Sequence, residues 1–170
     1  MGIISRFKDI MSANINALLD KAEDPEKMID QYLRNLESDL AKVKQETASV
    51  MAEEAKAKRQ LDECTAEVAK MQSYAEKAVL AGNDEDAKRF LMKKKELVVK
   101  QTSLQETYTL AAENAAKMRQ MHQKLVGDIS QLNSRRDAIK AKIAVAKTQQ
   151  TINKIGASVD GAAENLSAFD

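Results

Sequence analysis

The sequence predicts an all-α fold with three parts: an N-terminal amphipathic helix, a long antiparallel coiled-coil helical hairpin and a short C-terminal helical segment. Three observations lead to this prediction. Aromatic residues are scarce, with three Phe, three Tyr and no Trp among 170 residues, which indicates a thin seam between helices rather than a thick core. Apolar residues recur with a heptad period in two long stretches. A short break at Gly82 separates these stretches, and such breaks join antiparallel helices.

Residues 1–22 are predicted to form an amphipathic, membrane-binding helix. Its large apolar residues fall on one side of a helical projection, and Ser, Asn and Asp fill the opposite side. A helix this short is marginal in water, so its apolar face needs a lipid surface, a partner protein or a groove on its own fold. The residues alone favour lipid and protein about equally. The side chains expected to contact lipid are Ile3, Ile4, Arg6, Phe7, Lys8, Ile10, Met11, Ile15 and Leu18.

The hairpin is predicted over residues 24–155, with arms at about 25–81 and 84–155 and a tip at 82–84. Asp24 suits the N-cap of the first arm, and Pro25 suits its first turn. The heptad seam runs from Ile29 to Ala78 in the first arm and from Ala87 to Ala146 in the second. At the tip, Gly82 suits the left-handed position that ends a helix, and Asn83 or Asp84 suits the next N-cap.

One register places every seam residue of the first arm opposite a seam residue of the second. In this register large apolar side chains meet one another, and smaller ones face aromatic ones, as close packing requires. It also places Cys64 opposite Gln101 and Met71 opposite Lys94. The other pairs that define the register are Leu33 with Leu132, Leu61 with Leu104, Val68 with Leu97 and Ala75 with Phe90. The seam leaves no free groove for the first helix between Ile29 and Arg136.

The second arm extends beyond its partner. Past Arg136 it still carries an apolar stripe, so we expect this overhang to pack against other subunits. The residues expected to contribute to self-assembly are Ile139, Ile143, Val145, Ile152 and Ile155, with Arg135 and Arg136 meeting acidic patches. Gly156 and Gly161 are then expected to loosen the chain. Residues 156–170 are predicted to be a linker and the start of a further helix.

Several functional classes find no support in the sequence. Lys and Arg together number 27 against 26 Asp and Glu, so there is no bulk attraction to nucleic acid. There is no phosphate-binding loop, nucleophile motif or metal-ligand spacing, and the single histidine, His122, falls on the seam. We therefore expect a non-enzymatic protein without cofactor or metal. A lone cysteine, Cys64, and the lack of a secretory signal or membrane-spanning stretch favour a cytosolic protein, able to bind a membrane peripherally.

Three segments resemble the phage shock protein A family, which includes the vesicle-inducing protein in plastids and belongs to the ESCRT-III superfamily. They are the start MGIISRF at residues 1–7, the junction EDPEKMI at residues 23–29 and the tip GNDEDA at residues 82–87. The resemblance covers essentially the whole chain. The start and the junction are its more specific parts, because a heptad pattern alone matches any coiled coil.

The resemblance implies a peripheral membrane protein on the cytoplasmic, inner face of the plasma membrane. Such a protein would bind anionic lipids and self-assemble into ESCRT-III-like rods or rings that maintain or remodel the membrane in bacterial envelope stress. In some members the hairpin also inhibits an AAA+ transcriptional activator ATPase. The alternative function is therefore a soluble coiled-coil adaptor or regulator that sequesters such an activator.

The chain departs from the family pattern at its end. Members usually continue through a further helix that follows a Phe-acidic motif, and Phe169-Asp170 resembles the first two residues of that motif. Either the chain is truncated there or it is a naturally short member. The seam already pairs the two arms, so the N-terminal helix is left with lipid or the overhang, and the resemblance favours lipid.

Overall fold

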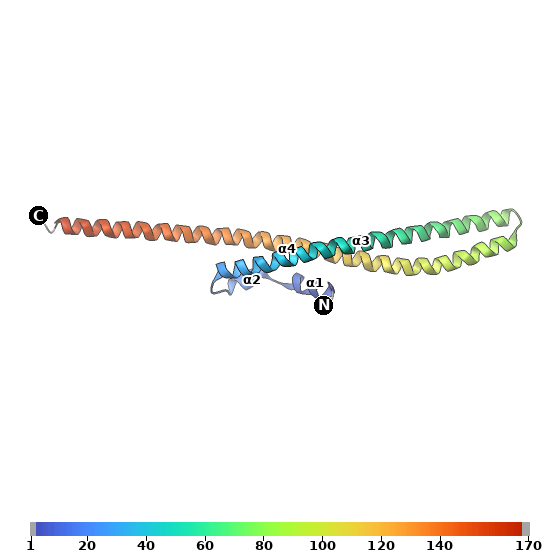
Figure 1. Ribbon diagram of the computed structural model, residues 1–170, viewed down its shortest axis with the longest axis horizontal. Coiled ribbons are helices and arrows are strands. Elements are labelled where there is room, and N and C mark those ends of the chain that lie inside the picture. The colour runs from blue at the N-terminus through green and yellow to red at the C-terminus, as the bar shows by residue number, and fades with distance from the viewer. Residues whose placement is uncertain (1–2, 168–170) are drawn as a thin grey trace. The chain divides into compact units, whose positions relative to one another are not determined.

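A computed structural model describes residues 3–167, and it describes the side chains of these residues except at 160 and 162–167. Within this range the protein is built from four helices (Figure 1). They are α1 (Ile3–Ser12), α2 (Ile15–Asp20), α3 (Pro25–Leu80) and α4 (Asp84–Ser167). No strand occurs within residues 3–167. The all-α class and the packing of two long helices are thus confirmed. Two compact units divide the chain: α1 with Asp39–Leu125, and Asn14–Ser38 with α4 from Val126 onward.

The start of α3 is defined by local chemistry. The backbone N–H of Lys27 donates to Oδ1 of Asp24 at 3.3 Å, so the Asp24 carboxylate satisfies a donor that the first helical turn leaves without a partner. Pro25 is the first residue of α3, where its missing N–H costs nothing. The predicted helix restart at this junction is confirmed.

The tip reverses the chain within three residues. Gly82 has a φ of 74°, which glycine adopts without the steric cost that a Cβ atom imposes. The N–H of Asn83 donates to the carbonyl of Ala78 at 2.8 Å, and the N–H of Gly82 donates to that of Val79 at 3.0 Å, which completes a Schellman motif. Oδ1 of Asn83 then accepts from the N–H of Asp86 at 3.1 Å and caps α4. Both tip assignments are confirmed.

In the first unit, α3 and α4 run antiparallel (Figure 1), and the contacts between them follow the predicted register. Sγ of Cys64 donates to the carbonyl of Leu97 at 3.3 Å, and Nε2 of Gln101 donates to Oγ1 of Thr65, the neighbour of Cys64, at 2.9 Å. Nζ of Lys94 lies 2.7 Å from Oε1 of Gln72, the neighbour of Met71. All predicted seam positions of this unit are buried or half-buried. Cys64, Lys94 and Gln101 therefore find partners across the seam, while the apolar seam residues pack.

Two boundaries differ from the prediction. The N-terminal helix is divided, because the side chain of Asn14 accepts from the N–H of Ala17 at 3.2 Å and starts α2 as a separate helix. The expected linker at residues 156–170 is wrong up to Ser167, since α4 continues through Gly156 and Gly161. A glycine inside a helix costs only about 1 kcal/mol relative to alanine, which one long helix absorbs. The predicted motif start at Phe169-Asp170 lies outside the described residues.

The register predicts a specific disulfide. Gln101→Cys should form an intrachain bond with Cys64 on mild oxidation, because Gln101 already contacts the residue next to Cys64. The measurement is the mobility and intact mass of the oxidised chain without reductant. Thr102→Cys is the matched control, since Thr102 is exposed and lies off the seam. A product containing only crosslinked pairs of chains would contradict the intrachain register.

Candidate functional site

The first part of the candidate site is α1, which packs within the first unit. The Arg6 guanidinium pairs with the Asp39 carboxylate of α3. Ile10 of α1 is buried, and Phe7 is half-buried. The expectation that the hairpin offers no groove to the N-terminal segment is therefore wrong. The apolar surface of the hairpin is wider than its heptad seam, as Met121 shows by being fully buried although it lies off that seam.

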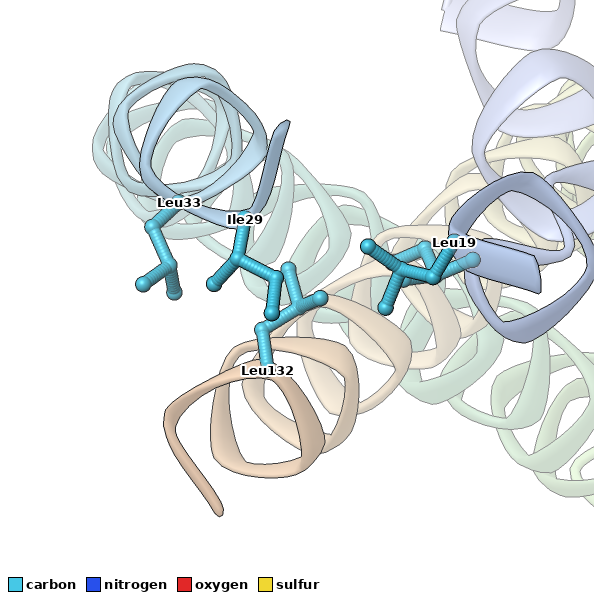
Figure 2. Close-up of a cluster of buried hydrophobic side chains, with 5 residues drawn as sticks. Leu19, Ile29, Leu33 and Leu132 are labelled. Carbon is cyan, nitrogen blue, oxygen red and sulfur yellow. The ribbon is translucent and has the colours of Figure 1, made fainter. Parts of the chain in front are cut away.

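The second part is α2, which packs within the second unit. Ile15 and Leu19 of α2 join Ile29 and Leu33 of α3 and Leu132 of α4 in one buried cluster. Figure 2 shows the side chains from these three helices meeting there. A ring of partly buried apolar side chains surrounds the cluster: Met28, Tyr32, Leu36, Ile129 and Ile139. Burial of this kind contributes about 1.5–3 kcal/mol for each large side chain, so it is the main attraction holding α2.

Arg135 of α4 adds polar contacts with α2 next to the buried cluster. Arg135 donates to Oδ1 of Asn16 at 3.3 Å and to Oδ1 of Asp20 at 3.4 Å. The side chains of Arg135 and Asp20 remain 41% and 71% exposed, and ion pairs this exposed contribute about 0–1 kcal/mol. The neighbouring Arg136 donates to Oδ1 of Asn133 at 3.0 Å and lies 3.9 Å from Asp30. Both arginines therefore make intrachain contacts, although the sequence assigned them to contacts between subunits.

The residues predicted to bind lipid are divided between α1 and α2, and within each helix some are buried and others are exposed. Because α2 begins anew at Asn14, Ile15 and Leu19 point inward at a spacing of four residues, and Leu18 points outward. Ile10 is buried in α1, while Ile3, Arg6 and Phe7 are half-buried. The exposed members are Ile4, Lys8, Met11 and Leu18. Sequence reasoning missed Leu19 because a single unbroken helix would place it beside the apolar face.

The overhang of α4 is exposed from Lys140 to Val159. Ile139 is half-buried in the second unit, whereas Ile143, Val145, Ile152 and Ile155 are exposed. Val159 is exposed too and was missed by the sequence reasoning. Val145, Ile152 and Val159 recur at intervals of seven residues with Ile155 between them, so the overhang carries a heptad stripe of its own. That regular spacing was the signal that would have identified Val159.

The remaining chemistry of the described residues is sparse. Across residues 3–167 no helix is long and apolar enough to cross a bilayer. The same stretch holds no cluster of three or more His, Cys, Asp or Glu side chains able to bind a metal ion. His122 is half-buried on the seam, and Cys64 is buried with its thiol donating to a backbone carbonyl.

Comparison with known proteins identifies the family. The model of the PspA/IM30 family matches residues 2–170. The chain belongs to the PspA/IM30 family. The chain is 63% identical over 169 residues to the phage shock protein A homolog of Bacillus subtilis, and the match covers 99% of this chain and 74% of that protein. The resemblance found in the start, junction and tip segments is thus confirmed.

More distant relatives of this PspA/IM30 family member carry other names. It is 28% identical over 152 residues to the membrane-associated protein Vipp1 of Nostoc punctiforme, covering 89% of this chain and 59% of that protein. It is 27% identical over 158 residues to protein LiaH of Bacillus subtilis, covering 93% of this chain and 70% of LiaH. None of these names denotes an enzyme.

The docking of α2 in this family member depends on Leu132. Leu132→Ala should destabilise the second unit by about 2–5 kcal/mol, because it leaves a cavity among side chains from three helices. The check is hydrogen exchange of the backbone amides in residues 14–38, which should become faster. Val145→Ala, on the exposed part of the same helix, should change stability by no more than about 0.5 kcal/mol. Unchanged exchange in Leu132→Ala would show that the cluster does not hold α2.

Proposed function

We propose that this protein is a peripheral, self-assembling scaffold that binds membranes through α1 and α2 and maintains or remodels them in bacterial envelope stress. The observation that carries the proposal is the mixed state of its N-terminal helices, which are docked through some apolar side chains while Ile4, Met11 and Leu18 stay exposed. Membership of the PspA/IM30 family supports it, because that family includes proteins named membrane-associated.

Lipid competes with the docked position of each helix. An apolar side chain gains about 1.5–3 kcal/mol by leaving water, whether it enters a protein cluster or the acyl region of a bilayer. In the docked position only Ile10, Ile15 and Leu19 of α1 and α2 are buried. On insertion into a bilayer, the side chains that are exposed in the docked position would be buried with them, so the total apolar area removed from water would be larger. The helices are suited to reversible binding rather than to permanent insertion.

Anionic lipids are the proposed membrane partner. Lys8 of α1 is exposed, and Arg6 is held by a single ion pair with Asp39. Each basic side chain close to an anionic surface contributes about 1 kcal/mol of attraction. This attraction brings α1 to the bilayer, and the apolar side chains then provide most of the binding free energy.

Self-assembly is proposed to use the overhang of α4, in polymers of ESCRT-III-like rods or rings. Val145 is 69% exposed, and the other residues of its stripe are exposed as well. Heptad stripes with β-branched residues every seventh position are typical of helices that pair with a second helix. A second copy of the chain carries the same exposed stripe, so it is the proposed partner.

A second candidate function is a soluble regulator that sequesters an AAA+ transcriptional activator. One observation favours it. Near the tip lies an apolar hollow of about 430 Å³, lined by Gln72, Ala75, Glu76, Val79, Leu80 and Leu91. Leu80 is 88% exposed there, and exposed apolar patches on a stable hairpin are typical of protein-binding surfaces. This surface does not require α1 or α2, so the two candidate functions use different parts of the chain.

Vesicle binding tests the membrane function. A chain lacking residues 1–21 should sediment much less with vesicles containing phosphatidylglycerol than the full chain does. Phe7→Asp should weaken sedimentation similarly, because a carboxylate on the apolar side of α1 opposes both insertion and attraction to anionic lipid. Ser5→Asp is the matched control, as it adds the same charge at an exposed polar position of the same helix. Circular dichroism should show nearly unchanged helix content in both variants. Equal sedimentation of the shortened and full chains would favour the soluble regulator.

Polymer formation tests the role of the overhang. Ile152→Asp should reduce the mass of assemblies measured by light scattering, because it places a charge in the centre of the exposed apolar stripe. Gln150→Asp adds the same charge two residues away, outside the stripe, and should assemble like the parent protein. Electron micrographs of both variants with and without lipid provide the second measurement. Assembly that is equally reduced in both variants would point to net charge rather than to the stripe.

A further inference from the structure

A small hollow lies beside the docked α2 in the second unit. Its volume is about 250 Å³, and α2, the start of α3 and α4 all contribute to its walls. The lining residues are Leu19, Pro25, Ile29, Arg135, Ala138, Ile139 and Lys142. Leu19 and Ile29 also belong to the buried cluster shown in Figure 2, so the hollow opens directly next to the contacts that hold α2.

The charged residues that line the hollow are basic, and one of them, Arg135, also pairs with Asp20 of α2. The other is Lys142. The α4 sequence around Lys142 adds to this positive charge, because the stretch between Asp137 and Asp160 contains three further lysines and no acidic residue. A cationic site of this kind attracts an anion, and a guanidinium presents two N–H donors to a phosphate.

The rest of the lining is apolar. Leu19, Pro25, Ile29 and Ile139 face the same hollow as the two cations. Leu19 and Ile29 are buried, but Pro25 is exposed and Ile139 is half-buried, and an inorganic anion bound to Arg135 and Lys142 would offer these two no apolar contact. A phospholipid supplies both parts, since its phosphate carries the charge and its glycerol and first methylene groups are apolar. The shared chemistry is a phosphate group, and the apolar walls select the lipid source.

Arg135 is held to α2 by two polar contacts that other hydrogen-bonding groups could replace. Arg135 contacts Asn16 and Asp20 over 3.3 and 3.4 Å, and Asp20 is largely exposed to solvent. A phosphate placed between Arg135 and Lys142 competes with the Asp20 carboxylate for the same guanidinium. Loss of the Asp20 pair would remove one of the two polar contacts between Arg135 and α2, and α2 would then depend more heavily on the burial of Ile15 and Leu19.

We propose that this hollow binds the headgroup of an anionic phospholipid and that the bound headgroup loosens α2 from the second unit. The inference rests on the membrane function proposed above. It adds a lipid site on the body of the protein to the insertion of the N-terminal helices. The proposal also explains why α2 would leave its cluster only where anionic lipid is present. The phosphate of the lipid would displace Asp20 from Arg135, and the acyl region of the same membrane would accommodate Ile15 and Leu19.

Paired lysine variants test the site. Lys142→Ala should weaken binding to phosphatidylglycerol-containing vesicles about fivefold, which corresponds to the loss of one basic side chain near the headgroup. Lys147→Ala is the matched control on the same helix, because Lys147 is exposed and does not line the hollow. Its binding should change less than twofold, and Lys142→Arg should restore most of the affinity. Equal weakening by Lys142→Ala and Lys147→Ala would overturn the proposal while leaving the membrane function intact. Failure of the parent chain itself to bind the vesicles would overturn the membrane function.

Hydrogen exchange of residues 14–38 tests the release of α2 and the source of the phosphate. A soluble short-chain phosphatidylglycerol should accelerate exchange of the α2 amides in the parent chain, and the acceleration should be smaller in Lys142→Ala. Vesicles of phosphatidylcholine alone and millimolar inorganic phosphate should leave the exchange unchanged. Acceleration by inorganic phosphate to the same extent would overturn the assignment to lipid. Unchanged exchange with the short-chain lipid would overturn the proposed loosening of α2.

Discussion

The pairing of α3 with α4 along their heptad seam is the interaction on which the rest of the structure depends. A helix of this length carries only a narrow apolar stripe, and that stripe is stable in water only when a second stripe covers it. In each unit the seam supplies this cover, and it also brings residues of α3 and α4 together at their outer faces. The surface that receives α2, formed by Ile29, Leu33 and Leu132, exists only because the two long helices lie side by side.

The N-terminal helices are held by less than the hairpin is. Within the described residues, α2 contributes two buried side chains, Ile15 and Leu19, together with exposed polar contacts to Arg135. The first unit retains α1 through Ile10 and the Arg6–Asp39 pair. Elements with few buried contacts open at a much lower free energy than the rest of a protein. The proposed membrane function uses this difference, because the helices change partner while the hairpin remains folded.

Most of the hairpin was predictable from the sequence, and the N-terminal segment was not. Long-range pairing, such as that of Cys64 in α3 with the part of α4 around Gln101, followed from the heptad period. A seam that is buried along its whole length strongly constrains the register of the two helices. The cap at Asp24 and the turn at Gly82 followed from residue chemistry. The break at Asn14 did not, since an asparagine is compatible with both a helix interior and an N-cap. That single choice rotates α2 and decides that Leu19 rather than Leu18 is buried. The continuation of α4 through Gly156 was also missed, because glycine lowers helix stability without forbidding a helix.

The short turn at the tip has a consequence for how copies of the chain recognise one another. The seam contacts made by α3 and α4 are the same whether the two helices belong to one molecule or to two, so the seam itself does not select intrachain pairing. The turn does, because Gly82 in its left-handed conformation keeps α4 at a very high effective concentration beside α3. If the turn straightened into helix, α3 of one copy would pair with α4 of a second copy through the same seam contacts, and the result would be a domain-swapped dimer. Three residues at the tip therefore determine which molecule each arm pairs with, although they contribute almost nothing to the buried surface.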